Sequence, residues 1–308
     1  MLKKRDLLSL INYKKDEIYR LLSQAMEFKR RYRRSADEKV LAGKNVALIF
    51  NKPSTRTRIS FEAAVTQLGG NAIYLTSNEL QLGRGETIED TGKVLARYVD
   101  AIVIRTFAHA DVEALAAAAD VPVINALTDD HHPCQALADL MTIMEAKGRL
   151  VGIKLAYVGD GNNVCHSLLI GAAKMGVDFK AACPAGYEPD AEVVKTAGAE
   201  AGGGLIEIVN DPHDAVSGAD IIYTDVWTSM GQEAEAKARR RDFSGFQVNS
   251  GLLSLAKPDA LVMHCLPAHR GEEISAEVLE GPQSVVFDQA ENRLHVQKAL
   301  LAWLIGEG

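Results

Sequence analysis

The sequence lacks the features that mark disulfide-rich, zinc-knuckle and membrane-spanning proteins. It has only four cysteines, and no two of them form a Cys-x-x-Cys pair, so neither a disulfide framework nor a zinc knuckle is expected. No hydrophobic run is long enough to span a bilayer, and the first residues lack the apolar stretch of a signal peptide. We therefore expect a cytoplasmic protein without a membrane partner.

The sequence also lacks an excess of positive charge. The formal net charge is -7, which argues against nucleic acid as a partner, and the basic run 30–34 is interpreted as a solvated helix end. What the chain does have is the composition of a folded globular protein, with 47% hydrophobic and 24% charged residues. Its 308 residues are enough for two domains of ordinary size.

Hydrophobic runs of strand length alternate with helical spacing along the chain, and this alternation predicts an α/β fold. We expect two doubly wound parallel-sheet domains with a crevice between them. Gly148–Gly152 marks the seam, so the predicted domains are 1–148 and 149–308, and a terminal helix at about 291–305 is expected to pack back on the first domain. The predicted strands are 46–50, 72–75, 101–104, 121–125, 154–158, 177–183, 205–209, 221–224, 261–265 and 284–287.

The stretch Lys52–Arg58 organises the first half of the sequence. It follows the apolar run 46–50 and precedes residues spaced as in a helix, so it predicts a strand, a tight turn and a helix start. The unpaired N–H groups and the dipole at a helix N-terminus favour an anion, best a phosphate. Ser54, Thr55 and Thr57 add hydroxyl donors, and Arg56 adds a planar fork for two oxygens.

Two further predicted strands of this half end in polar residues. Arg105 ends the strand 101–104, and His132 with Gln135 flanks a helix start at Pro133, after the strand 121–125. Ligands bind outside the carboxyl ends of strands in open α/β sheets, so we expect these side chains to face the same crevice as Arg56. A role for His132 in helix capping is the alternative.

The second half carries its chemistry at other strand ends. Gly159–Asn163 resembles a dinucleotide-binding turn, but Val164 replaces the third glycine, and we reject NAD binding. Asn163 suits either a carboxylate ligand or a helix cap. Asp225 follows the strand 221–224 and could bind an ammonium group, whereas Cys265 by itself fits a small buried hydrophobe as well as a functional thiol.

Together these motifs resemble the aspartate/ornithine carbamoyltransferase family over nearly the whole chain. The first phosphate motif is shared across that family, whereas the segments at 225–231 and 264–267 are specific to its ornithine branch. The motifs are Ser54-Thr55-Arg56-Thr57-Arg58, Gln81 in its Gly-bearing loop, Arg105, His132-Pro133-Cys134-Gln135, Asp225-Val226-Trp227-Thr228-Ser229-Met230-Gly231 and His264-Cys265-Leu266-Pro267.

The resemblance implies a function and a set of roles. The function is transfer of the carbamoyl group of carbamoyl phosphate to the δ-amine of L-ornithine, giving citrulline and phosphate, in arginine biosynthesis or degradation. Gln81 would come from a neighbouring subunit of a homotrimer with shared sites. Carbamoyl phosphate would contact Ser54, Thr55, Arg56, Thr57, Gln81, Arg105, His132, Pro133, Cys134, Gln135, Cys265, Leu266 and Arg293; ornithine would contact Asn163, Asp225, Ser229 and Met230.

The residue types agree with this chemistry. Asp225 and Cys265 would orient the amine and help to remove its proton, and which of them accepts the proton stays open. Arg105 and His132 would meet the charge that builds on the carbamoyl oxygen. We expect no metal and no organic cofactor. The alternatives are a carbamoyltransferase for acetylornithine, succinylornithine or putrescine, and a non-catalytic amino-acid or phosphate sensor.

Overall fold

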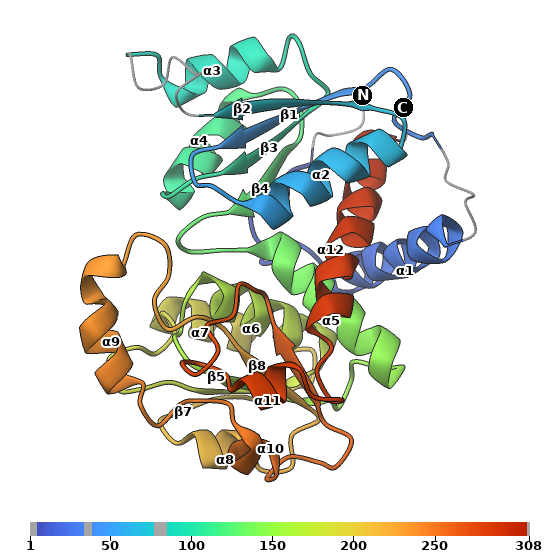
Figure 1. The fold of residues 1–308 in the computed structure, drawn as a ribbon. Coiled ribbons are helices and arrows are strands. Elements are labelled where there is room, and N and C mark those ends of the chain that lie inside the picture. Colours follow the sequence, from blue (N-terminus) through green and yellow to red (C-terminus); the bar gives the residue numbers. More distant parts are fainter. Residues whose placement is uncertain (1–4, 34–38, 77–84, 307–308) are drawn as a thin grey trace. The chain divides into compact units, whose positions relative to one another are not determined.

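A computed structural model describes residues 5–33, 39–76 and 85–306 of the chain. The chain divides into two compact units (Figure 1). Unit 1 comprises Met1–Leu137 and Asn292–Gly308, and unit 2 comprises Ala138–Glu291. Two long helices, α5 (Pro133–Lys147) and α12 (Val286–Leu301), contain the points where the chain passes from one unit to the other.

Unit 1 is built on a four-stranded parallel sheet in the order β2-β1-β3-β4. The order reverses at the centre, because the chain leaves β1 toward β2 on one side and later returns to β3 on the other. Its elements up to α5 are α1 (Lys15–Tyr32), β1 (Asn45–Phe50), α2 (Thr55–Gln67), β2 (Asn71–Thr76), α3 (Ile88–Leu95), β3 (Ala101–Arg105), α4 (His109–Ala118) and β4 (Val123–Leu127).

Helices cover both faces of the unit 1 sheet. One core cluster joins β1 and β3 to α4 through Ile49, Ile104, Val112 and Leu115, with Ile88 of α3 packed against it. On the other face, the helix α2 crosses the strands (Figure 1). The strands β1 and β3 are buried on both faces, and this accounts for their unbroken hydrophobic runs.

Unit 2 repeats the design with five parallel strands in the order β7-β6-β5-β8-β9, which reverses between β5 and β8. Its elements are β5 (Lys154–Val158), α6 (Asn163–Met175), β6 (Asp178–Ala182), α7 (Ala191–Ala199), β7 (Ile206–Val209), α8 (Pro212–Val216), β8 (Ile221–Thr224), the short 3-10 helix η2 (Glu233–Glu235), α9 (Ala236–Asp242), α10 (Ser250–Leu253), β9 (Leu261–His264) and α11 (Ala276–Leu279).

The two faces of the unit 2 sheet have different cores. On one face, Ile222 and Val262 pack with Val216 of α8 and with the segment that contains Phe243 and Leu252. The strand residues that alternate with these include three with aromatic rings, Tyr157, Phe179 and Tyr223. The ring of Tyr157 stacks on that of Tyr223, with ring centroids 5.6 Å apart. Figure 1 shows α6 and α7 on one side of this sheet and α8 and α10 on the other.

The predicted fold class of two doubly wound parallel-sheet domains is confirmed. The strand predicted at 284–287 is wrong, because Ser284 makes only an isolated bridge to Val262 and the helix α12 begins at Val286. The β-branched residues Val285 and Val286 favour a strand by their type, but Val286 is the first residue of a helix in this structure. The last described element is a π-helical turn, η3 (Ala302–Gly306).

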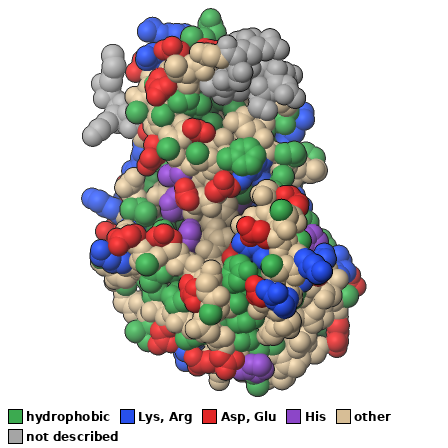
Figure 2. All heavy atoms as spheres, turned by 90° about the vertical axis from the view of Figure 1, so that its left-hand side faces the viewer, with side chains coloured by type: hydrophobic (Ala, Val, Ile, Leu, Met, Phe, Trp, Pro, Cys, Tyr) green, Lys and Arg blue, Asp and Glu red, His purple; other side chains and the backbone are tan. Residues whose placement is uncertain are grey.

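The hydropathy of the described helices and the charge on one face of the molecule can be compared with the composition of the sequence. Among the described helices, none combines the length and the apolar character needed to cross a bilayer. On the face shown in Figure 2, basic and acidic side chains are interspersed, and hydrophobic side chains are scattered among them. This mixture agrees with the modest negative net charge of the sequence.

Gly161 provides a test of this packing. A Cβ atom on Gly161 would lie 2.2 Å from the backbone nitrogen of Pro189, whereas one on Gly198 of α7 would meet nothing within 4 Å. We expect Gly161→Ala to lower the free energy of unfolding by about 1–3 kcal/mol, because backbone must move to make room. Gly198→Ala is the control. Denaturant unfolding measures both, and equal stability of the two variants would contradict the assigned close approach.

Candidate active site

The first group of predicted site residues lies at the reversal point of the unit 1 sheet. Ser54–Thr57 lies in the turn and helix start that follow β1, separated from its end by three residues, and Arg105 is the last residue of the adjacent strand β3, paired in register with Phe50. The carboxyl ends of β1 and β3 therefore present both segments at one edge of the sheet. In open α/β sheets this reversal point is where ligands bind.

The start of α2 has the geometry of an anion site. Ser54 is the N-cap residue, and its Oγ accepts a hydrogen bond of 3.2 Å from the backbone N–H of Thr57. The first turn of α2 contains no acidic residue. Its N–H groups and dipole thus carry positive potential, with the guanidinium group of Arg56 in the same turn. Thr55 is exposed and Thr57 is buried.

Arg293 of α12 gathers the remaining residues of this group. Its Nη2 donates a hydrogen bond of 2.8 Å to Oγ1 of Thr57. Its Nη1 lies 2.5 Å from Oε1 of Gln135 and 3.3 Å from Nε2 of His132. Arg293 is 3% exposed, so this contact set is part of the interior of unit 1. Residues separated by up to 236 positions in the sequence are joined here by one guanidinium group.

His132 reports the electrostatics of the cluster. Burial and the charges of Arg293, Arg105 and Arg56 hold the pKa of His132 well below its ordinary value of 6.5. The imidazole is therefore neutral at physiological pH, and its proton is a hydrogen-bond donor rather than a charge. The three guanidinium groups come from three different segments of the chain, namely α2, the end of β3 and α12.

A lysine beside this cluster was missed by sequence analysis as a candidate site residue. Lys52 is 4% exposed, forms an ion pair with Asp129, and lies 4.2 Å from the centroid of the Phe107 ring. Lys52 follows β1 and Asp129 follows β4. Only its position in the motif Lys52–Arg58 could have drawn attention to it.

The second group lies at the reversal point of the unit 2 sheet. Asp225 follows β8, and its carboxylate accepts hydrogen bonds from three groups: Asn162 Nδ2 to Oδ2 at 2.8 Å, and the Val226 N–H and the Cys265 thiol to Oδ1 at 2.8 and 3.0 Å. The turn after β5 and the ends of β8 and β9 thus converge on one carboxylate. These hydrogen bonds hold the carboxylate in one orientation.

Asn162, rather than the predicted Asn163, is the N-cap of α6. Its Oδ1 accepts hydrogen bonds from the N–H groups of Val164 and Cys165, while its Nδ2 reaches Asp225. The capping alternative for Asn163 is wrong, because that residue is already the first helical position. Sequence analysis chose between two adjacent asparagines, and only the backbone geometry distinguishes them.

A buried polar pair lies behind Cys265. His264 Nδ1 accepts a hydrogen bond from the Leu266 N–H at 2.8 Å, so its Nε2 carries the hydrogen and donates it to Glu273 Oε1 at 3.2 Å. The backbone N–H of His264 donates to Gln289, which in turn donates to Asp139. This network fixes the end of β9, and sequence analysis did not identify Glu273.

Two groups of side chains in the described part of unit 2 are close enough to hold a metal ion. Within the first group, hydrogen bonds already join Cys265 to Asp225, and both ring nitrogens of His264 are used. Hydrogen bonding thus accounts for the arrangement of the first group. The groups are Asp225 with His264 and Cys265, and His269 with Glu272 and Glu273.

The other predicted residues lie along the same segments, with one exception. Pro133 and Cys134 are buried in the first turn of α5. Leu266, next to Cys265, has a left-handed φ of 59°, which is costly for a branched side chain. In the segment after β8, Ser229 is held by Gln232, and Met230 is 48% exposed. Gln81 lies outside the described residues.

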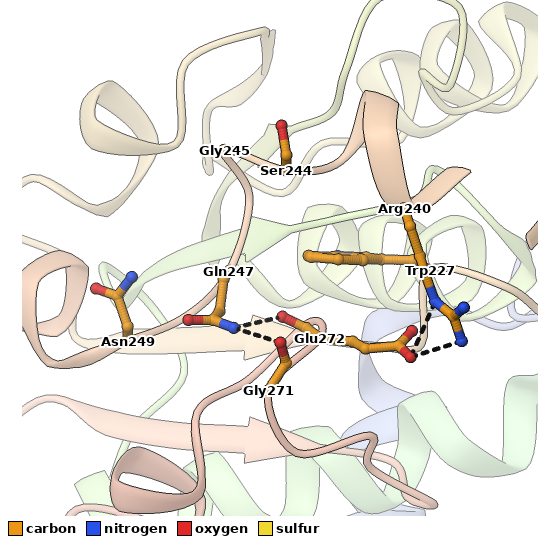
Figure 3. Close-up of a pocket in the computed structure, with 8 residues that line it drawn as sticks. All are labelled: Trp227, Arg240, Ser244, Gly245, Gln247, Asn249, Gly271 and Glu272. Carbon is orange, nitrogen blue, oxygen red and sulfur yellow. Dashed lines mark hydrogen bonds and ion pairs between the residues drawn. The ribbon is translucent and has the colours of Figure 1, made fainter. Parts of the chain in front are cut away.

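One cavity of about 460 Å³ opens beside the segment that follows β8 (Figure 3). Figure 3 shows the Trp227 ring reaching into it beside Arg240, which pairs with Glu272, while Gln247 donates to the Gly271 and Glu272 carbonyls. None of the predicted site residues lines this cavity. Trp227 lines the cavity and lies two residues after Asp225 in the same segment.

Sequence models of the aspartate/ornithine carbamoyltransferase family match both parts of the chain. The carbamoyl-phosphate-binding domain matches residues 5–145, and the aspartate/ornithine-binding domain matches residues 151–304. The chain belongs to the aspartate/ornithine carbamoyltransferase family, as its motifs predict.

Individual relatives narrow the comparison within this family. The chain is 58% identical to the ornithine carbamoyltransferase of Pyrococcus horikoshii, over 99% of this chain and 97% of the relative. It is 58% identical to the anabolic ornithine carbamoyltransferase of Pyrococcus furiosus, over 98% and 96%. A solved structure of the P. furiosus enzyme superposes with a TM-score of 0.97 at 57% identity, covering 100% of this chain and 99% of that one.

The electrostatics of His132 can be measured directly. Because its pKa is held well below 6.5, ring nitrogens observed by NMR should still show a neutral imidazole at pH 6. The folded state then binds fewer protons than the unfolded state below pH 6.5, so this group makes the protein less stable as the pH falls further. His132→Gln assigns the signal. A protonation midpoint near 6.5 would contradict the cluster of guanidinium groups.

Proposed function

We propose that this chain transfers the carbamoyl group of carbamoyl phosphate to the δ-amine of L-ornithine, giving L-citrulline and inorganic phosphate. The observation that carries the proposal is that each unit has one chemically distinct cluster at the reversal point of its sheet. A cationic cluster around neutral His132 suits an anionic donor. A carboxylate with three hydrogen-bond donors, Asp225, suits an amine. The names of the close relatives support the same substrates.

Unit 1 binds carbamoyl phosphate. The phosphate group takes the N–H groups at the start of α2 and the hydroxyl and guanidinium groups of Ser54–Thr57, because these donors match its charge and its several oxygens. Arg105 reaches both the phosphate and the carbamoyl oxygen. His132 and Gln135 hold the carbamoyl group. Arg293 contacts His132, Gln135 and Thr57, and it thereby fixes the positions of His132 and Gln135 relative to the start of α2.

Unit 2 binds ornithine. Asn163, Ser229 and Met230 hold the α-amino acid end, and Asp225 and Cys265 face the δ-amine. An alkylammonium group has a pKa of about 10, so the amine must lose a proton before it can attack. The Cys265 thiol donates its hydrogen to Asp225, so it acts as a donor there. The Asp225 carboxylate, which accepts hydrogen bonds, is therefore the better partner for an ammonium N–H.

The reaction forms one bond and breaks another. The neutral δ-nitrogen attacks the carbamoyl carbon, and negative charge builds on the carbamoyl oxygen beside Arg105 and the N–H of neutral His132. The bond from carbon to the phosphate oxygen then breaks, and phosphate leaves with its charge held by Arg56 and α2. Two protons leave the δ-nitrogen. The ammonium group loses the first through the Asp225 cluster before attack, and the second passes to the departing phosphate as the new bond forms, so that hydrogen phosphate and neutral citrulline are released.

The same proposal extends to direction, assembly and location. We propose the biosynthetic direction, because one close relative is named anabolic. The chain forms a homotrimer in the cytoplasm, and Gln81 of one subunit completes the site of its neighbour, as the family resemblance implies. No disulfide joins the four cysteines, which suits a reducing compartment.

A direct assay tests the reaction. With carbamoyl phosphate present, L-ornithine should yield citrulline, while acetylornithine, succinylornithine and putrescine should react at least tenfold more slowly. Arg105→Ala should lower kcat by about 10²–10³-fold, the usual effect of removing a donor to a developing oxyanion. Arg149→Ala, an exposed site, is the control. Ligand binding without citrulline would favour the sensor alternative, and full activity of Arg105→Ala would refute its role.

Mixed assemblies test the shared site. Gln81→Ala and Arg105→Ala should each be nearly inactive alone, because each removes one part of every site. Refolded mixtures should regain activity, up to about a quarter of the wild-type value at equal ratio, because some sites then draw intact residues from two subunits. Light scattering should give three times the chain mass. No recovery in mixtures that do form trimers would show that each site is self-contained.

A further inference from the structure

The segment Asp225–Gly231 carries the proposed ornithine contacts. A buried arginine from another element, α9, contacts its backbone. Arg239 of α9 donates from Nη1 to the carbonyl oxygen of Trp227 at 3.0 Å. The same Nη1 lies 3.0 Å from Oδ2 of Asp160, in the turn between β5 and α6. One guanidinium group thus joins α9, the middle of the ornithine segment and a turn at the reversal point of the sheet.

The turn that carries Asp160 also holds the beginning of the segment. Asn162, two residues later, donates to the Asp225 carboxylate at 2.8 Å. The segment is therefore held at Asp225 by a side-chain amide and at Trp227 by a guanidinium group, and both anchors belong to one rigid corner. Beyond Trp227 the chain becomes more exposed, reaching 48% at Met230. Local hydrogen bonds to Gln232 and Glu233 hold Ser229 and Gly231, whereas Asn162 and Arg239 tie the first half of the segment to the turn after β5.

The Arg239 pair is buried, which distinguishes it from ordinary surface ion pairs. The side chains of Arg239 and Asp160 are 8% and 9% exposed. Burial raises the pKa of Asp160 to about 6, and the charge of Arg239 opposes this rise. Removing one partner of such a pair leaves an uncompensated buried charge, so the local backbone must rearrange to admit water. The Nε of Arg239 also donates to Glu235, which orients the guanidinium group along α9.

The next residue offers a matched comparison. Arg240 lies on the same helix turn and also forms an ion pair, with Glu272 (Figure 3). Its side chain is 61% exposed, and an exposed pair of this kind contributes little. Among the described residues, the hydrogen bonds of the Arg240 side chain go to Glu272 and not to the backbone of the ornithine segment. Replacing Arg240 therefore removes the same charge from the same helix without removing an anchor of the segment.

We propose that Arg239 is a positioning residue for the amine substrate, because its contacts to Asp160 and to the Trp227 carbonyl set the conformation of Asp225–Gly231. The proposal rests on the proposed ornithine-binding role of this segment. Arg239 itself does not touch the substrate. It acts on the affinity for ornithine through the backbone, and it leaves the carbamoyl phosphate half of the chemistry, which belongs to unit 1, unchanged.

The test compares Arg239→Ala, Arg239→Lys and Arg240→Ala in the full-length protein. Arg239→Ala should raise KM for ornithine at least tenfold while its affinity for carbamoyl phosphate, measured by calorimetry, stays within twofold of wild type. Arg240→Ala should leave both quantities within twofold. Arg239→Lys should fall between them, because an ammonium group restores the charge, but its shorter side chain and single nitrogen cannot replace both the Nη1 contacts and the Nε contact to Glu235. Unchanged KM in Arg239→Ala would overturn the proposal.

Hydrogen–deuterium exchange gives a readout that does not depend on activity. The peptide that covers 225–231 should exchange at least tenfold faster in Arg239→Ala than in wild type or Arg240→Ala. If wild type makes no citrulline, the proposed function fails, and exchange still decides whether Arg239 holds the segment. If Arg239→Ala does not fold, Arg239→Lys and Asp160→Asn decide. Equal exchange in all folded variants would overturn the anchoring role.

Discussion

The reversal of strand order at the centre of each parallel sheet is the constraint on which the rest of the structure depends. At that point the connections leave in opposite directions, so the ends of two neighbouring strands are not covered by their own helices. In unit 1 the opening falls between β1 and β3, and in unit 2 between β5 and β8. Each opening is filled with polar side chains, and the two sets differ in chemistry.

The cationic set of unit 1 is arranged so that charge and hydrogen bonding are supplied by different residues. Three guanidinium groups raise the positive potential, and the same potential keeps His132 neutral. A protonated imidazole would add a fourth cation to a buried cluster, which is costly at low effective dielectric. Arg293 offsets part of the repulsion by hydrogen bonds to the uncharged side chains of Thr57 and Gln135. The cluster is thus organised before an anion arrives, which lowers the reorganisation needed on binding.

The anionic centre of unit 2 follows the opposite logic. Asp225 receives hydrogen bonds from an amide, a backbone N–H and a thiol, so its carboxylate is held in one orientation. Behind it, the buried pair of His264 and Glu273 fixes the strand end that carries Cys265. Charge and orientation are supplied here by residues from three strand ends, and Arg239 adds the restraint on the segment beyond Asp225.

The parts predicted from sequence were those with a local signature. Unbroken hydrophobic runs indicated buried parallel strands, and polar residues at the ends of those runs indicated Ser54, Arg105 and Asp225 as candidates. Contacts across long sequence distances had no such signature: Arg293 with His132, and Arg239 with Asp160, are fixed only by tertiary packing. The N-cap of α6 was not identified from sequence, because helix caps depend on backbone dihedral angles that the adjacent Asn162 and Asn163 do not reveal.

A crystal structure with a phosphonate analogue of carbamoyl phosphate and with L-ornithine tests the central claim most directly. We expect the phosphonate oxygens within hydrogen-bond distance of Arg56 and of the N–H groups at the start of α2, and the ornithine amine against Asp225. Ligands bound away from the reversal points of the two sheets would contradict the claim, and so would a phosphonate placed on unit 2.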